Sequence, residues 1–172
     1  NSILELGQAN SMNFSILIPT KDRVEELKRC IMSFYSTACF KSKIEFLIRI
    51  DTEQNEELVH KLLNLQREMF EQGIFIRTLC AKGSAYKDLH EYMNLLANYA
   101  TGYWLLLATD DCIMKTYNWD ITIDNYRTAK YCVINPCGNG LNLFPIVSRP
   151  FYETLKHISL QTHYDSWIST CA

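Results

Sequence analysis

The stretch Tyr103–Asp111 reads Tyr-Trp-Leu-Leu-Leu-Ala-Thr-Asp-Asp and decides how the rest of the chain is interpreted. Its six apolar or aromatic residues are too few to cross a membrane and are typical of a strand buried on both faces. The adjacent carboxylates Asp110 and Asp111 follow, and an unpaired charge is costly to bury. Because parallel strands end at a ligand crevice, the two acids are candidates to hold a cation and a phosphate. A plain turn explains the same residues equally well, so the decision depends on the rest of the chain.

The segments before this stretch alternate between strand and helix patterns. Apolar, β-rich runs cover 14–18, 44–50 and 74–80, and apolar residues recur at helical spacing over 24–38, 58–69 and 89–100. Three strand–helix pairs followed by a strand predict right-handed parallel crossovers. We therefore expect an α/β fold: a single three-layer α/β/α domain with a mainly parallel sheet.

The pattern loosens after Asp111. It predicts a short helix after Trp119, a strand at 131–135, and an irregular or edge strand at 143–148 because that run contains Pro145. Helices are expected from Pro150 to about His157 and from about residue 163 to the end.

Length and charge limit the classes of protein that fit. A chain of 172 residues is long enough for one domain, which we expect over residues 14–172, with residues 1–13 as a leader or a cloning remnant. A formal net charge of −2, without a basic run, argues against nucleic acid or an anionic membrane as partner. The chain has neither a membrane-length apolar run nor a signal peptide. Seven cysteines without a Cys-x-x-Cys motif favour free, buried thiols in a reducing, cytoplasmic compartment.

Acids also stand near the ends of other predicted strands. Asp22 follows the first strand and Asp51 ends the second, so both should meet Asp110 and Asp111 at one edge of the sheet. Asp22-x-x-Glu25 also has the form of a helix capping box, and the nucleotide and capping roles both stay open. The chain has neither the Gly-x-Gly-x-x-Gly of a dinucleotide site nor a P-loop. An acidic crevice without a glycine cradle needs a divalent cation, Mg²⁺ or Mn²⁺, to hold a diphosphate.

Several motifs together resemble the family-two-like, inverting glycosyltransferases of the GT-A fold. In order along the chain they are Ser15-Ile-Leu-Ile-Pro-Thr-Lys-Asp-Arg23, Leu47-Ile-Arg-Ile-Asp51, Asn94 before Ala100-Thr-Gly102, Leu107-Ala-Thr-Asp-Asp111, Asn142-Leu-Phe-Pro-Ile-Val-Ser-Arg149 and His163-Tyr-Asp-Ser-Trp167. The resemblance covers the chain from about Phe14 to its end. It implies transfer of a sugar from a nucleotide diphosphate to a hydroxyl group of a glycan or other acceptor, and we expect the donor to be a UDP-sugar.

The resemblance also implies roles for individual residues. Asp165 matches the catalytic base, which takes the proton of the acceptor hydroxyl. The metal ligands would be Asp110, Asp111 and His163, with Mn²⁺ or Mg²⁺ as cofactor. The nucleotide-binding residues would be Pro19, Thr20, Asp22, Arg23, Asp51, Lys82, Asn94 and Asp110.

Two features depart from the family pattern. Ala108 occupies the first position of the metal-binding Asp-x-Asp, so metal binding depends on Asp110 with help from Asp111. The chain also ends soon after Asp165, where relatives continue with acceptor-binding structure. A catalytically degenerate module that binds nucleotide sugars therefore stays open. A nucleotidyltransferase is the other alternative, although Pro19-Thr-Lys-Asp-Arg23 lacks the glycine-rich phosphate loop usual in that class.

Overall fold

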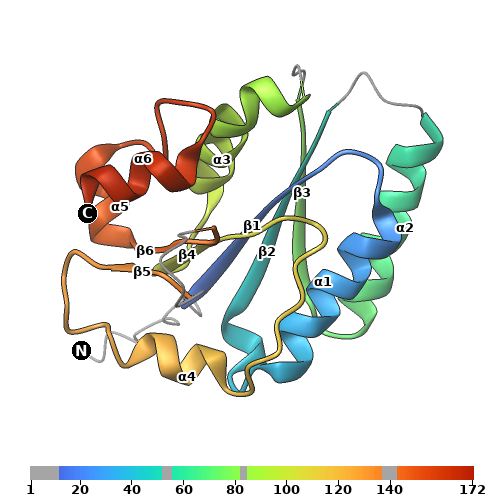
Figure 1. The fold of residues 1–172 in the computed structure, drawn as a ribbon. Coiled ribbons are helices and arrows are strands. Elements are labelled where there is room, and N and C mark those ends of the chain that lie inside the picture. Colours follow the sequence, from blue (N-terminus) through green and yellow to red (C-terminus); the bar gives the residue numbers. More distant parts are fainter. Residues whose placement is uncertain (1–11, 52–55, 82–84, 137–142) are drawn as a thin grey trace, which may run out of the picture.

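The computed structural model describes residues 12–51, 56–81, 85–136 and 143–172. The strands are β1 (Phe14–Thr20), β2 (Ile44–Asp51), β3 (Phe75–Ala81), β4 (Trp104–Leu107), β5 (Val133–Ile134) and β6 (Ile146–Ser148). The helices are α1 (Val24–Thr37), α2 (Glu56–Glu71), α3 (Leu89–Tyr99), α4 (Trp119–Asp124), α5 (Arg149–Leu155) and α6 (Tyr164–Cys171), and single 3-10 turns cover Lys41–Lys43 and Ala85–Asp88. Figure 1 shows the strands between two groups of helices.

The strands form one sheet in the order β3-β2-β1-β4-β6-β5. β1 to β4 are mutually parallel, β6 is antiparallel to β4, and β5 is antiparallel to β6. The predicted α/β class and mainly parallel sheet are confirmed. The expectation for 143–148 is wrong in part, because the strand begins only after Pro145 and lies between β4 and β5 instead of at the edge.

The direction of β5 and β6 matters for the site. β5 runs the same way as β4, and β6 runs the opposite way. The end of β5 and the start of β6 therefore both lie at the edge of the sheet where β4 ends. Residues as distant in sequence as Ala108 and Phe144 consequently come to the same edge.

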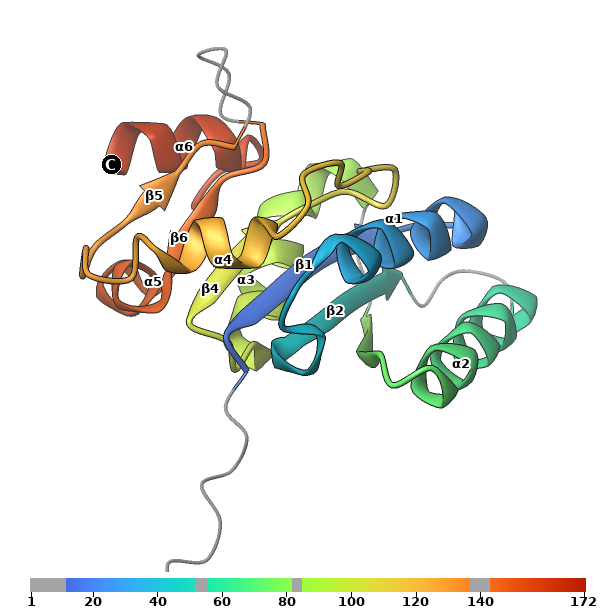
Figure 2. The same ribbon diagram turned by 90° about the horizontal axis from the view of Figure 1, so that it is seen from below.

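Alternate residues of each central strand face opposite helical layers, as the geometry of a strand requires. Ile16 and Ile18 of β1 pack in one cluster with residues of α1, α2 and α4, whereas Leu17 packs in a second cluster with residues of α3, α5 and α6. Figure 2, seen from below, shows the same division of the helices. Because helices cover both faces of the sheet, the central strands consist of nearly continuous runs of apolar residues.

Two expectations about local structure are wrong. α1 begins at Val24, with Arg23 at the N-cap position and no side-chain capping bond, so the capping box at Asp22 does not form. Of the six cysteines in the described part of the chain, all are free, but Cys39, Cys80 and Cys171 are exposed instead of buried. Across the same residues, no helix combines the length and the apolar character needed to cross a bilayer.

A hydrogen-bonded cluster closes the N-terminal edge of the sheet. Glu45 of β2 is buried and accepts bonds from Ser15 Oγ at 2.6 Å, from the backbone N–H of Thr101 at 2.6 Å and from Arg77 Nη2 at 2.7 Å. The backbone N–H of Gly102 donates to Ser15 Oγ at 2.8 Å. A Cβ at Gly102 would lie 2.7 Å from the backbone nitrogen of Ser15, so this close approach requires glycine.

Candidate functional site

Four side chains meet at the C-terminal edge of the sheet. We call them the acid–arginine cluster, and they are Thr20, Arg23, Asp110 and Asp111. Arg23 Nη2 donates to Asp110 Oδ1 at 2.5 Å, and Nη1 donates to Asp111 Oδ2 at 3.1 Å. Thr20 Oγ1, at the end of β1, donates to Asp110 Oδ2 at 2.8 Å. Residues about 90 positions apart in sequence are thus brought together, as the parallel sheet predicted.

The two acids of the cluster have different surroundings. Asp110 is 2% exposed, and burial raises the pKa of its carboxyl although Thr20 and Arg23 stabilise the charged form. Asp111 is exposed, and the hydroxyl of Thr109, which donates to Oδ1 at 2.6 Å, lowers the pKa of its carboxyl together with Arg23. The charge of Asp110 in turn raises the pKa of the Arg23 guanidinium. The cluster therefore holds a poorly solvated carboxylate behind an accessible one.

The loop that follows β4 is fixed against α1. The backbone N–H of Met114 donates to Ser33 Oγ at 2.9 Å, and the backbone N–H of Asn118 donates to the carbonyl oxygen of Thr37 at 2.7 Å. The indole N–H of Trp119 donates to the carbonyl oxygen of Phe34 at 3.0 Å. These bonds place Asp111 and the residues after it relative to the helix that follows Arg23.

Asn94 of α3 holds the connection between α5 and α6. Its Nδ2 donates to the carbonyl oxygen of Ser159 at 2.7 Å, and its Oδ1 accepts from the backbone N–H of Ile158 at 2.6 Å and of Ser159 at 3.1 Å. These bonds use both ends of the amide, so Asn94 positions the chain that leads into α6. Its predicted contact with a nucleotide stays a prediction.

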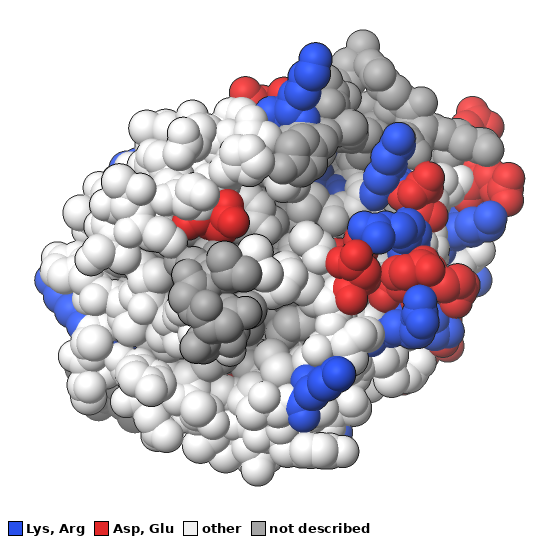
Figure 3. Space-filling model, in the orientation of Figure 1, with Lys and Arg blue, Asp and Glu red and all other residues white. Residues whose placement is uncertain are grey.

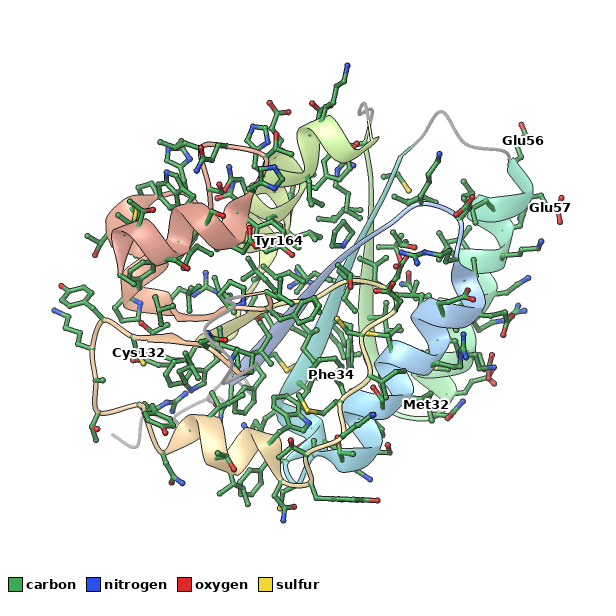
Figure 4. The ribbon with its side chains drawn as sticks, viewed as in Figure 1. Met32, Phe34, Glu56, Glu57, Cys132 and Tyr164 are labelled. Carbon is green, nitrogen blue, oxygen red and sulfur yellow. The ribbon has the colours of Figure 1, made fainter. Side chains whose placement is uncertain are left out.

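Asp165 and His163 lie at the start of α6, on the α3 side of the sheet. The neighbouring Tyr164 is buried and points toward the sheet (Figure 4). Asp165 is half-buried in the first turn of the helix. Among the residues that the structure describes, no hydrogen bond or ion pair joins Asp165 to the acid–arginine cluster, and no three His, Cys, Asp or Glu side chains form a metal-binding group. His163 therefore belongs to no such group with the acid pair among these residues, and its role as a metal ligand stays a prediction.

The remaining predicted nucleotide residues are only partly placed. Pro19 lies in β1 beside Arg49 of β2, next to Thr20. Asp22 is exposed and lines a shallow hollow between α1 and α2 instead of joining the acid pair. Asp51 is the last residue of β2, but its side chain lies outside the described part, as does Lys82 as a whole.

Arg49 is a charged residue at this edge that the sequence analysis passed over. It is 3% exposed, its guanidinium carbon lies 3.2 Å from the ring centroid of Tyr92 on α3, and Nη2 donates to the carbonyl oxygen of Ala81 at 3.4 Å. A stacked guanidinium of this kind is stabilised by the aromatic face. In the sequence, the only sign of this residue's importance is the presence of an arginine inside the apolar run Ile44–Ile50.

The acid pair suits a divalent cation. Mg²⁺ and related ions take one or two protein carboxylates and complete their shell with water and phosphate oxygens. Each carboxylate oxygen of Asp110 and Asp111 accepts a hydrogen bond, and such an oxygen can accept a second partner. Arg23 is meanwhile the counter-ion that keeps two adjacent negative charges together.

Several solved structures with similar folds are glycosyltransferases. The mannosyltransferase PcManGT from Pyrobaculum calidifontis, in complex with GDP-Man and Mn²⁺, has a TM-score of 0.63 at 10% identity over 89% of this chain and 50% of its own. GlyE from Streptococcus pneumoniae TIGR4 has a TM-score of 0.57 at 11% identity over 94% of this chain and 43% of its own. TarS 1-349 from S. aureus in complex with UDP has a TM-score of 0.55 at 14% identity over 71% of this chain and 34% of its own.

The fold is GT-A-like. This chain spans about a third to a half of the length of these GT-A-like neighbours. No protein-family model matches the GT-A-like chain, and no curated protein matches it in sequence.

Proposed function

We propose that this chain is a glycosyltransferase that moves a sugar from a nucleotide diphosphate to a hydroxyl acceptor with inversion, using a divalent cation. The observation that carries the proposal is the acid–arginine cluster at the C-terminal edge of a GT-A-like sheet. Such edges are where α/β folds bind ligands. Neighbours of the same fold hold UDP, UDP-GlcNAc or GDP-Man, and UDP is the nucleotide we favour.

Each residue of the cluster has a task in this proposal. A cation held by Asp110 and Asp111 would stabilise the negative charge that develops on the leaving diphosphate. Arg23 can turn from the acids to a phosphate oxygen, because its side chain is half exposed and guanidinium pairs well with phosphate. Thr20 keeps Asp110 oriented through its hydroxyl bond.

Asp165 is the proposed general base. Its carboxylate makes no side-chain hydrogen bond to another described residue, so it is available to an acceptor hydroxyl. Asn94 would act as a positioning residue, since it fixes the 158–159 segment from which the chain enters α6.

Thermal denaturation of the 172-residue chain with UDP, GDP, ADP and CDP, each with and without Mn²⁺, tests the proposal. At a hundredfold excess over Kd, binding adds about 2.7 kcal/mol, so we expect Tm to rise by roughly 5–10 °C with UDP and Mn²⁺ together. Asp110→Asn should abolish this rise, and the exposed Glu153→Gln on α5 is the matched control that should keep it. Equal shifts for all nucleotides, or no shift, would contradict the proposal.

A module that binds nucleotide sugars without transferring them is a second candidate. Ala108 in place of the first acid of the family motif, together with the pairing of both remaining acids with Arg23, favours it. Asp165→Asn distinguishes the two candidates. A transferase should keep the UDP-dependent rise in Tm and lose sugar transfer by about a hundredfold or more, as expected when a general base is removed. A binding module has no transfer to lose.

A further inference from the structure

An apolar cavity lies directly beside the acid–arginine cluster. Its volume is about 330 Å³, and it is bounded by Phe34 of α1, Ala108 at the end of β4, Ile113 and Met114 of the following loop, and Phe144 before β6. Figure 4 shows Phe34 on the side of α1 that faces the strands. Among the described residues, Asp111 is the only charged residue in its wall.

Asp111 belongs to both the cavity and the cluster. Its carboxylate is bound to Arg23 at 3.1 Å, and the residue also lines the cavity. A group that fills the cavity therefore lies next to the site proposed for the diphosphate. Figure 3 shows the charged side chains gathered over α1 and α2, while the neighbouring surface toward β5 and β6 is largely uncharged.

The wall of the cavity is already formed. The backbone N–H of Met114 donates to Ser33 Oγ, and the carbonyl oxygen of Phe34 accepts a bond from the indole N–H of Trp119, so the backbone of both wall residues is fixed. A preformed apolar cavity of this size lies at the small end of the range for ligand sites, which begins at about 300 Å³.

The wall excludes most polar occupants. A sugar ring would need a hydrogen-bond partner for each buried hydroxyl, and an unpaired buried hydroxyl is costly. The described side chains that line it offer one carboxylate and otherwise apolar carbon, sulfur and aromatic groups. An aliphatic or aromatic group satisfies this wall, because the burial of apolar surface is favourable.

We propose that this cavity binds the apolar body of the acceptor, so that the sugar is transferred to a hydroxyl carried next to an aliphatic or aromatic group. This inference rests on the proposed function and adds the substrate class on the acceptor side. The apolar body enters between Ile113 and Phe144, and its polar end lies toward Asp111.

Isothermal titration of the 172-residue chain with hexyl β-D-glucoside and methyl β-D-glucoside tests the proposal. The two probes share a polar head and differ by five methylene groups. Each methylene that is buried tightens binding about fourfold, so hexyl glucoside should bind at least about tenfold more tightly than methyl glucoside. Equal affinity for the two probes would overturn the proposal.

Two variants locate the binding. Ile113→Gln changes a side chain that is 50% exposed, so the fold should persist, and we expect it to weaken hexyl glucoside about threefold or more. Leu63→Gln on α2 is the matched control, since Leu63 is 53% exposed and lies in a different hollow. Weakening by the control variant, or none by Ile113→Gln, would overturn the proposal.

Binding of UDP with Mn²⁺ is titrated separately on the same samples. If UDP binds and hexyl glucoside does not, the inference about the cavity is wrong while the proposed function stands. If hexyl glucoside binds at Ile113 and UDP does not bind, the proposed function is wrong, and with it the acceptor role of the cavity.

Discussion

Glu45 and Asp110 place a buried carboxylate beside an arginine at opposite edges of the same sheet. Glu45 is 1% exposed and Asp110 is 2% exposed. Burial alone would raise the pKa of Glu45, but hydrogen bonds from Ser15, Thr101 and Arg77 together lower it below its ordinary value. For Asp110 burial prevails, and its pKa is raised.

The pKa values of the two carboxyls shift in opposite directions because the carboxyls accept hydrogen bonds from different numbers and types of donors. Glu45 accepts bonds from two hydroxyls, one backbone N–H and one guanidinium. Asp110 accepts one hydroxyl and one guanidinium, and its Arg23 is half exposed and shared with Asp111. A fully bonded carboxylate stabilises the fold, whereas a carboxylate with few donors and a movable counter-ion is suited to a ligand.

The largest expected loss of stability follows from a substitution at the N-terminal edge of the sheet. Glu45→Ala leaves Ser15 Oγ and the Thr101 N–H without their acceptor and leaves Arg77 Nη2 with only the carbonyl oxygen of Tyr99, at 2.8 Å. Removal of one partner from a buried pair typically costs about 3–5 kcal/mol. Because Arg77 is 36% exposed, we expect a loss of about 3 kcal/mol in the free energy of unfolding. Urea denaturation measures it, and a loss below about 1 kcal/mol would remove the structural role assigned to Glu45.

A smaller change in stability is expected from a substitution at the C-terminal edge of the sheet. Asp110→Asn keeps an oxygen for Arg23 and can donate to Thr20 Oγ1, and it removes a charge that burial disfavours. The free energy of unfolding should change by less than about 1 kcal/mol. The same urea titration applies, and a loss equal to that of Glu45→Ala would show that both edges are structural.

The pH dependence should show the smallest effect. Because the pKa of Glu45 is lower in the folded chain than its ordinary value of 4.5, the unfolded chain binds more protons in the window between these values. The stabilisation from ionised Glu45 is therefore present above pH 4.5 and is lost as the pH falls through the folded pKa. The difference in Tm between the unsubstituted chain and Glu45→Gln should narrow below pH 4.5, and a constant difference would contradict the assignment.

Much of the fold and the centre of the site follow from the sequence. Apolar periodicity predicted the order of the elements, and the rule that parallel strands end at one edge predicted that Asp110 lies near the end of β1. Arg23 and Thr20 were expected to contact a nucleotide, but their bonds to the acids depend on side-chain directions that spacing does not determine. The strand β6 was placed at an edge because Pro145 was counted as part of it.

Other features depend on long-range packing that no local pattern reveals. Asn94 binds a segment more than 60 residues later, which a helical position alone cannot indicate. The cavity forms because β5 and β6 return Phe144 to the edge where β4 ends, and the reversal of β6 has no local sequence signature. The exposed cysteines also show that an apolar neighbourhood in sequence does not ensure burial.

The segment 108–114 contributes to both proposed ligand sites, since it supplies the acid pair on one side and the apolar wall on the other. If both proposed sites hold, replacing side chains in this segment changes donor and acceptor selectivity together. Phe144 reaches the cavity from the opposite wall and is only half-buried, without a bond to the acids among the described residues. On the proposed assignment, libraries randomised at Phe144 change the acceptor preference and leave the proposed donor site unaltered.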